Sequence, residues 1–524
     1  MFDQIIRNGT VLDGSGSPRR RADVGIRGMK IIAVDDLSGA KAAEEIDAAG
    51  KMVAPGFIDI HSHADFILPF LPTADSKVHQ GITLEVTGNC GDSFAPLSVD
   101  MRVEANEENR QHPERKVDWL SFAEYTARLQ DQGISVNTAI LVGHGTLRRK
   151  VMQMSNAAPT AEQMSAMQHE LRTALEQGAI GLSTGLIYTP SVYAKTDEII
   201  ALARTVANMG GIYTSHIRGE ANTLLEALDE ALLVGREAGI RVEVSHLKAS
   251  GIKNWHKMEP ALEKLERARE NGIDVAADMY PYNASNTGLS SLIPDWVHVD
   301  GLETMLARLK DPAVRAQLHH DLADVIDVNG VDWDQIYISD CPDHPTYEGR
   351  HLAEIAAERR QHPWDAVMDI LIECRLRVDI IEFTMRADNV ARGLQDPWVS
   401  VCTDAGGRAA EGPFSEGRPH PRNYGSFPRV LGYYCREQCL FSWEEAVRKM
   451  TGLPASRLRL SDRGLLKPGF CADLVVFDPL HVADQATFTD PHRYPTGIDW
   501  VIVNGEVVIA NGQHTGARPG RVIS

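Results

Sequence analysis

The central part of the chain repeats one pattern of apolar and polar positions. An apolar stretch without clean alternation ends in polar residues, and a helical segment such as AEQMSAMQHELRTALEQ (161–177) usually follows. Continuous apolar strands that alternate with helices predict a parallel sheet covered by helices. The stretches are VAPGFIDIHSH (53–63), GITLEVTGNC (81–90), VNTAILVGHG (136–145), GAIGLSTG (178–185), GGIYTSHIRGE (210–220), IRVEVSHLK (240–248), GIDVAADMYPY (272–282) and PWVSVCTDAGG (397–407). Eight such units favour an α/β fold of the TIM type, a (β/α)8 barrel, with the active site at the carboxyl ends of its strands.

Both ends of the chain have a different pattern, in which short apolar runs are separated by glycine turns. Examples are DQIIRNGTVLDGSG near the N-terminus and IDWVIVNGEVVIANGQ near the C-terminus. These runs predict β-strands. We expect residues 1–54 and 465–524 to pair into one small β-sandwich domain beside a catalytic barrel of residues 55–464. Separate terminal caps are the alternative.

A long interval separates the seventh and eighth apolar stretches and contains DQIYISD (334–340) between helical patterns. We expect an insertion before barrel strand 8, a subdomain of about residues 284–346 over the barrel mouth. The alternative is an extended loop with extra helices.

Composition and charge narrow the class of protein. The 524 residues are 43% hydrophobic and carry a formal net charge of −19, without a block rich in Lys and Arg. Nucleic acids and membranes are therefore poor candidates as partners. The seven cysteines are scattered, which favours a reducing compartment. No secretory signal or apolar run of membrane-spanning length is visible, so we expect a cytoplasmic protein.

Side chains that bind metals gather at the predicted strand ends. His61 and His63 close the first stretch two residues apart, a spacing that points both imidazoles the same way in a strand. The other stretches supply Cys90, His216, His246 and Asp404. Thiolate and imidazole ligands suit zinc, and catalytic zinc sites leave one position open. One set of three, Cys90, His216 and His246, leaves that position free, while the remaining residues complete the site or hold a second, weaker ion.

The motifs HSHAD, GNCGDS, STGLIY, SHIRGE, SHLKASG, DMYPY, TDAGG and HPRNYGSFPRV together resemble those of the N-acyl-D-amino-acid deacylases (D-aminoacylases) of the amidohydrolase superfamily. The resemblance covers nearly the whole chain and implies an amidohydrolase-type barrel. It also implies one zinc ion held tightly by Cys90, His216 and His246, with His61, His63 and Asp404 forming a weaker second position. Related hydantoinases and dihydroorotases use a carboxylated lysine from the fourth strand, and GAIGLSTGLIY contains no lysine.

The reaction implied by the resemblance is hydrolysis of an N-acyl-D-amino acid to a carboxylate and the free D-amino acid. Asp404 is the expected general base and acid, which takes a proton from a water activated by zinc and later delivers it to the leaving amine. Lys248 and Arg422 match the positions that bind the substrate carboxylate. Tyr280 matches a hydroxyl donor to the carboxylate or the oxyanion.

Other polar residues leave the side-chain preference open. Asn286 stands where some family members carry a serine that helps to bind substrate. Arg386, Arg408 and Arg418 are candidates to accept an acidic side chain, although surface positions are the default expectation. We expect His144 to make structural hydrogen bonds.

Three alternative functions remain open from the sequence alone. They are a cyclic amide hydrolase of the hydantoinase or dihydroorotase type, an amidohydrolase-type deaminase, and a non-catalytic scaffold on the same fold. The last class tends to lose metal ligands, and this chain retains all of them. A homo-oligomer is consistent with barrels of this kind.

Overall fold

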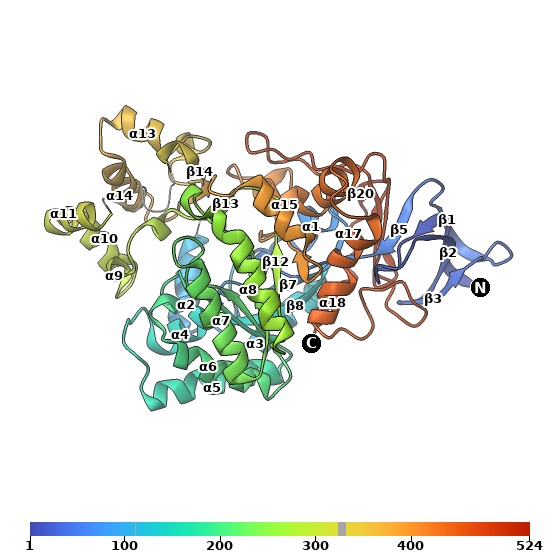
Figure 1. Cartoon of the computed structure of the whole chain (residues 1–524), viewed down its shortest axis with the longest axis horizontal. Helices are drawn as coiled ribbons and strands as arrows, with labels where there is room; N and C mark the ends of the chain where they lie inside the picture. The colour runs from blue at the N-terminus through green and yellow to red at the C-terminus, as the bar shows by residue number, and fades with distance from the viewer. Residues whose placement is uncertain (111, 323–331) are drawn as a thin grey trace.

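A computed structural model describes residues 1–110, 112–322 and 332–524 (Figure 1). Parallel strands form a sheet in the order β16-β12-β11-β10-β9-β8-β7-β6, with β21 (Val522–Ile523) paired to β8. The strands are β6 (Phe57–Asp59), β7 (Ile82–Thr87), β8 (Asn137–Gly143), β9 (Gly181–Gly185), β10 (Ile212–His216), β11 (Arg241–Val244), β12 (Val275–Met279) and β16 (Val399–Val401). Each of them lies in one of the eight predicted stretches, so the predicted (β/α)8 barrel is confirmed.

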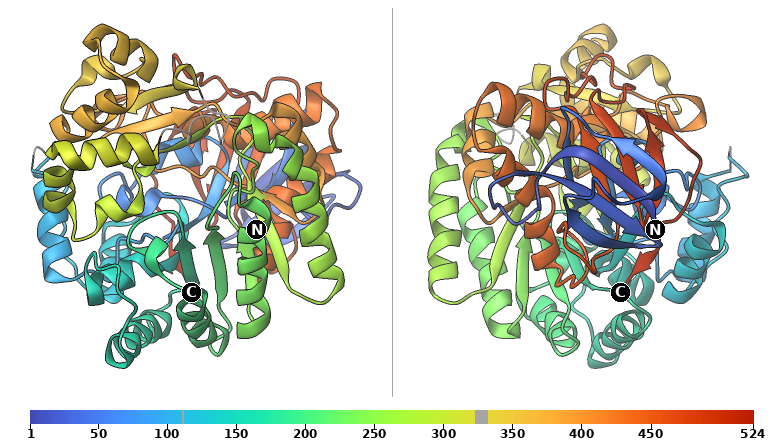
Figure 2. Two further views of the ribbon diagram at one scale, coloured as in Figure 1. Left: turned by 60° about the vertical axis from the view of Figure 1, so that its left-hand side comes forward. Right: turned by 90° about the vertical axis from the view of Figure 1, so that its right-hand side faces the viewer.

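The strands are buried along their whole length, which explains their continuous apolar sequences. Helices cover the outside of the barrel (Figure 2). They include α4 (His144–Met152), α5 (Ala161–Glu176), α6 (Thr196–Ala207), α7 (Leu224–Ala238), α8 (Met258–Glu270), α15 (Ala387–Gln395) and α17 (Trp443–Met450). A capping box between Thr160 and Gln163 fixes the start of α5.

Polar contacts join the first and last strands of the barrel. The backbone N–H of Asp404 donates to the carbonyl of His61 at 2.9 Å, and Ser62 pairs with Ala405 as an isolated parallel bridge. Beneath this seam the fully buried Lys77 of α1 (Asp75–Val78) donates to Asp59 at 2.9 Å. A buried charge is tolerated only when it is paired and hydrogen-bonded. These contacts hold two strand ends that carry predicted metal ligands side by side.

Strands from both ends of the chain form a second sheet, in the order β20-β19-β18-β17-β5-β1-β2-β3, with β4 paired to β1. The strands are β1 (Phe2–Val11), β2 (Arg20–Arg27), β3 (Lys30–Asp35), β4 (Ala42–Asp47), β5 (Met52–Pro55), β17 (Leu474–Phe477), β18 (Ile498–Val503), β19 (Glu506–Ala510) and β20 (Gln513–His514). The two halves meet where β17 runs antiparallel to β5. The domain boundaries at residues 54 and 464 stay a prediction.

The segment before the last barrel strand has its own sheet and core. Its sheet has the order β13-β15-β14, from β13 (Ser285–Gly288), β14 (Ile336–Asp340) and β15 (Asp379–Glu382). Its helices include α9 (Asp295–His298), α10 (Leu302–Lys310), α11 (Pro312–Asp321), α13 (Leu352–Arg359) and α14 (Pro363–Glu373). A hydrophobic cluster runs from Leu289 to Ile380, well past the predicted end near residue 346, because α13, α14 and β15 all pack side chains into it. Residues 323–331 of the predicted insertion lie outside the described residues.

Figure 2 shows this segment, in yellow and gold, above one end of the barrel strands. Within the described ranges, every helix is too short or too polar to cross a bilayer.

Candidate active site

The six predicted metal ligands converge at the carboxyl ends of the barrel strands. His216 is the last residue of β10, and the others lie directly beyond the ends of β6, β7, β11 and β16. The ligand atoms of His61, His63, Cys90 and Asp404 all lie within 4.8 Å of one another, and so do those of Cys90, His216 and His246. Cys90 therefore belongs to both groups.

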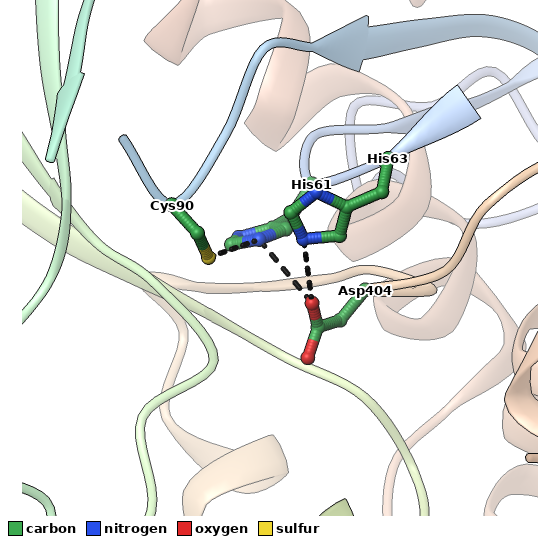
Figure 3. A group of neighbouring side chains, drawn as sticks. All are labelled: His61, His63, Cys90 and Asp404. Atoms are coloured by element: carbon green, nitrogen blue, oxygen red, sulfur yellow. Dashed lines mark hydrogen bonds and ion pairs between the residues drawn. The ribbon is translucent and has the colours of Figure 1, made fainter. Parts of the chain in front are cut away.

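The Cys90 sulfur is the centre of the cluster. Its Sγ lies 3.3 Å from His61 Nε2, 3.7 Å from His216 Nδ1 and 3.4 Å from His246 Nε2. The Asp404 carboxylate closes the other side, with Oδ1 3.1 Å from His63 Nε2 and 3.4 Å from His61 Nε2 (Figure 3).

Three of these residues have an unusual backbone conformation. Cys90, His246 and Asp404 have φ angles of 52°, 35° and 49°. Such left-handed conformations are uncommon for residues other than glycine and cost about 1–3 kcal/mol each. Strain of this kind persists where the surrounding structure enforces it, and here it turns each side chain from its strand end toward the cluster.

Glycines on neighbouring strands make room for the Cys90 turn. A Cβ on Gly185, at the end of β9, would lie 2.0 Å from the Cys90 carbonyl oxygen, and one on Gly88 would lie 2.2 Å from the Leu141 carbonyl oxygen. Gly88 and Gly91, on either side of Cys90, both have φ of 76°. Only glycine allows the backbones to approach this closely.

Two carboxylates, the partly exposed Glu220 and the buried Asp278, lie behind the histidines. Glu220 Oε1 is 3.0 Å from His246 Nδ1, and its Oε2 is 3.7 Å from His216 Nε2. Asp278 Oδ1 is 3.4 Å from His61 Nδ1 and accepts a hydrogen bond of 2.8 Å from the His246 backbone. Carboxylates at the second ring nitrogen orient metal-binding histidines and raise their basicity. Sequence reasoning missed both residues, although Glu220 in SHIRGE and Asp278 in DMYPY lie next to predicted site residues.

Electrostatics favour the ionised forms of the acidic ligands. Burial alone raises the pKa of the Cys90 thiol, but the charges of His61 and His246 hold that pKa well below its usual range. Burial likewise opposes ionisation of Asp404, yet Arg422 and His246 keep its pKa well below the usual value. The pKa of His63 is raised to about 9, because hydrogen bonds to Asp404 and Cys90 outweigh its burial.

This donor set fits a transition metal. A thiolate with imidazole nitrogens suits zinc, whereas magnesium and calcium prefer oxygen ligands. His61 Nδ1 and His216 Nε2 point to the carboxylates of Asp278 and Glu220. The other ring nitrogens, His61 Nε2 and His216 Nδ1, lie 3.3 and 3.7 Å from the Cys90 sulfur and are the ones available to bind a metal. Distances between ligand atoms of 3.1–3.7 Å match the spacing around one or two shared cations.

The predicted carboxylate-binding residues lie beside the cluster. Arg422, at the start of α16 (Arg422–Arg429), donates from Nη1 to Asp404 Oδ2 at 2.7 Å. Its buried Nε has no partner among the described residues. Lys248 Nζ is 2.7 Å from His246 Nδ1 and also contacts Glu220. The ring of Tyr280 lies 4.7 Å from the Arg422 guanidinium carbon, while its hydroxyl donates to the Met385 sulfur at 3.4 Å.

The remaining candidates lie in different surroundings. Arg408 lines the same cleft as the cluster and pairs with Asp340 at 3.3 Å. Arg386 pairs with Asp388 and is not among the residues that line this cleft, nor is Arg418. The Asn286 amide donates to Ser339 at 3.1 Å and to the Ile380 carbonyl at 2.7 Å, both in the inserted segment.

His144 is enclosed in a polar network. It is fully buried, 2.9 Å from Ser191 Oγ and 2.9 Å from Glu198 Oε1. Arg148 binds the same carboxylate at 2.7 Å. These contacts agree with the expected structural role.

A cleft of about 2100 Å³ opens above the cluster, between the barrel and the inserted segment. Cys90, His216, Lys248, Tyr280 and Arg422 line its floor. Acid–base groups, metal donors and two cations therefore face one cleft, the arrangement expected of an active site.

Known proteins are similar to this chain along its length. A model of the amidohydrolase family matches residues 44–509. The D-aminoacylase of Alcaligenes xylosoxydans xylosoxydans is 38% identical over an alignment that covers 100% of this chain and 98% of that protein. The N-acyl-D-glutamate deacylase of the same organism is 40% identical, with 100% and 96% covered.

A solved structure is similar over the same length. The N-acyl-D-glutamate deacylase of Bordetella bronchiseptica, complexed with zinc and a phosphonate mimic of the tetrahedral intermediate, superposes with a TM-score of 0.83. It is 38% identical, and the match covers 100% of this chain and 99% of that one. With the family match over residues 44–509 and relatives of 38–40% identity along its whole length, this chain belongs to the amidohydrolase family.

Proposed function

We propose that this chain is a zinc-dependent deacylase that hydrolyses the amide bond of N-acyl-D-amino acids to a carboxylate and a free D-amino acid. The observation that carries the proposal is the placement of the Cys90 sulfur within 3.3–3.7 Å of three histidine nitrogens, with Arg422 and Lys248 beside them. The relatives that align with the whole chain are named as enzymes that act on N-acyl-D-amino acids, which supports the same substrate class here.

Cys90, His216 and His246 would hold one zinc ion tightly, and His61, His63 and Asp404 would provide the weaker second position. Bound zinc supplies a Lewis acid that polarises an amide carbonyl and lowers the pKa of a water to about 7. The carboxylates of Glu220 and Asp278 keep the histidine rings oriented toward the ion.

Asp404 is the proposed general base and acid. Its low pKa keeps the carboxylate ionised near neutral pH, so it can accept the proton of the attacking water. Arg422 fixes Oδ2 at 2.7 Å, which leaves Oδ1 facing the cluster. The same carboxyl group then returns the proton to the nitrogen of the leaving amine. Once this nitrogen is protonated, the C–N bond can break, and its electron pair stays on the nitrogen.

Arg422, Lys248 and Tyr280 are the proposed binding residues for the substrate's α-carboxylate. The unpartnered Nε of Arg422 offers a further donor, and a guanidinium pairs with a carboxylate through two parallel hydrogen bonds. Lys248 adds a second positive charge. Its ammonium lies 5.8 Å from the Tyr280 ring centre, so the three side chains form one patch.

The residues of β9 argue against a cyclic amide hydrolase. The strand Gly181–Gly185 reads GLSTG and offers no lysine for a carboxylated bridge, and Cys90 occupies the middle of the cluster instead. The deacylases that align with this chain are named for N-acyl amino acids, in which the amide is linear.

The test is release of free amine from paired N-acetyl-D- and N-acetyl-L-amino acids by the zinc-loaded protein. Methionine, leucine, phenylalanine, glutamate and aspartate cover apolar and acidic side chains, and ninhydrin reports the product. We expect turnover of the D-forms only, and turnover about 10²–10⁴-fold slower by an Asp404→Asn control. Hydrolysis of the L-series, or of neither series, would reject the proposal.

A cytoplasmic location and assembly into a homo-oligomer are also proposed. The location rests on the scattered, unpaired cysteines, because disulfides form mainly in oxidising compartments. Fractionation of the native host and light scattering of the purified protein test these two points.

A further inference from the structure

The cleft is larger than a small acylated amino acid needs. Its volume is about 2100 Å³, whereas pockets for small molecules usually measure about 300–1000 Å³. The zinc ligands and the carboxylate-binding cations occupy only its floor. The rest of the cleft extends under the inserted segment, and the function proposed above gives it no role.

The order of the barrel strands sets the direction of a bound substrate. Lys248 follows β11, Tyr280 follows β12, and Arg422 follows β16, and these three strands are neighbours. The strands β7, β8 and β9 lie across the barrel mouth from them. In an N-acyl amino acid the acyl group and the α-carboxylate lie on opposite sides of the scissile amide. A carboxylate held over β11, β12 and β16 therefore directs the acyl group over β7, β8 and β9.

Apolar side chains line the cleft on that second side. They come from α2 (Val99–Glu108) after β7, from the end of α4 after β8, and from the loop after β9. The residues are Met101, Val103, Met152, Met154 and Ile187. Val103 and Ile187 are 53% and 36% exposed, so both present apolar surface to solvent inside the cleft. The same wall also carries charged side chains, among them Glu104, Glu107 and Lys150, and the apolar side chains between them offer contacts to an apolar acyl chain.

The inserted segment covers this side of the cleft. The Asp300 backbone N–H donates to the Met154 carbonyl at 3.4 Å, and the Tyr193 hydroxyl donates to the Asp295 carbonyl at 2.7 Å. Leu302, at the start of α10, is 40% exposed and also lines the cleft. Apolar side chains thus face the space from both the barrel loops and the segment above them.

We infer that the acyl groups of the natural substrates are medium- or long-chain apolar acyl groups, which lie over β7, β8 and β9 beneath the inserted segment. This inference rests on the proposed deacylase function. It adds an acyl-binding region formed by Met101, Val103, Met152, Met154, Ile187 and Leu302.

The first test varies the acyl chain on one D-amino acid. N-acetyl, N-hexanoyl, N-octanoyl and N-dodecanoyl derivatives of the preferred D-amino acid are compared by kcat/KM, below their micelle concentrations. We expect kcat/KM of the octanoyl substrate to exceed that of the acetyl substrate by about tenfold or more, which is the gain from burying only two of its six additional methylene groups. A constant or falling kcat/KM along the series would overturn the inference. Turnover of the acetyl substrate tests the deacylase function separately, so the two failures are distinguishable.

The second test uses two valines of the same helix. Val103 lines the cleft, whereas Val99 does not, and the two are similarly exposed at 53% and 55%. We expect Val103→Glu to lower the octanoyl-to-acetyl ratio of kcat/KM by threefold or more, while Val99→Glu keeps the wild-type ratio. Equal ratios in both variants would overturn the inference. Loss of folded protein would lower kcat/KM for the octanoyl and the acetyl substrate of a variant by the same factor. The ratio of the two values within each variant therefore reports binding of the acyl group.

Discussion

The two halves of the metal cluster share Cys90 but differ in their surroundings. In the first half, His216 and His246 have side-chain exposures of 5% and 2%, and the Glu220 carboxylate lies behind both rings. In the second half, the His63 side chain is 28% exposed, and Asp404 is already paired with Arg422. His61 is fully buried between the halves, with Asp278 behind it.

This difference suits the first half to bind the metal ion and the second half to take part in the reaction. Buried imidazole rings, a thiolate and a supporting carboxylate favour a tightly held ion. Asp404 already forms an ion pair with Arg422 and would lose part of that pairing on binding a metal. The second half therefore attracts a cation less strongly than the first half does. The same weak attachment would leave the Asp404 carboxylate available for its proposed role as general base and acid. Four substitutions test the comparison.

The largest effect is expected from Cys90→Ser, because the thiolate belongs to both halves. We expect loss of the tightly bound zinc and of nearly all turnover. The loss of affinity should exceed the roughly 10–100-fold cost of removing an outer-shell partner. Zinc content after dialysis, measured by atomic emission, checks this. Cys439→Ser removes an exposed thiol and serves as the control. Wild-type zinc content in Cys90→Ser would contradict the central role of the thiolate.

Asp404→Asn should separate the two halves. We expect kcat to fall by about 10²–10⁴-fold, because the amide cannot accept a proton, while one zinc per chain remains. Steady-state kinetics and zinc analysis of one preparation measure both. Near-normal kcat would remove Asp404 from the mechanism, and loss of all zinc would make it an essential ligand of the tight site.

Glu220→Gln should weaken the first half without emptying it. The amide still fills the space behind His216 and His246 but loses the charge that supports the rings, so we expect zinc affinity to fall by about 10–100-fold. Competition with a fluorescent chelator gives the affinity. Glu226→Gln, at an exposed position of α7, is the matched control. Equal affinities of the two variants would mean that Glu220 does not support the ligands.

The smallest effect is expected from His63→Asn, which alters only the exposed corner of the second half. We expect the tight zinc to remain and a second, weaker binding event to disappear, with only a few-fold change in turnover. Titration of the one-zinc protein with further zinc, followed by calorimetry, detects that event. Loss of the tight zinc would show that the two halves act as one site.

Local patterns in the sequence were enough to predict the barrel and to single out the six metal-type side chains. Continuous apolar runs mark strands buried on both faces, and each predicted ligand stands at the polar end of such a run. Because parallel barrel strands all present their carboxyl ends to one side, the placement of His61, Cys90 and His216 follows from the fold class.

The tertiary structure alone decided how those side chains are supported. The distance from Glu220 to two histidines depends on how β10 and β11 pack, and the inserted segment extends to Glu382 because β15 returns to pair with β13 and β14. The left-handed backbone at Cys90, His246 and Asp404 is likewise imposed by close packing rather than by local preference.

The sequence by itself therefore determined the strands, the metal-type side chains and the edge of the barrel where they meet, since periodicity and residue chemistry are local properties. Only the tertiary structure decided which carboxylate supports which ring, which cation pairs with Asp404 and where apolar side chains line the cleft. Those contacts join residues far apart in the chain, and their distances depend on the packing of every element between them.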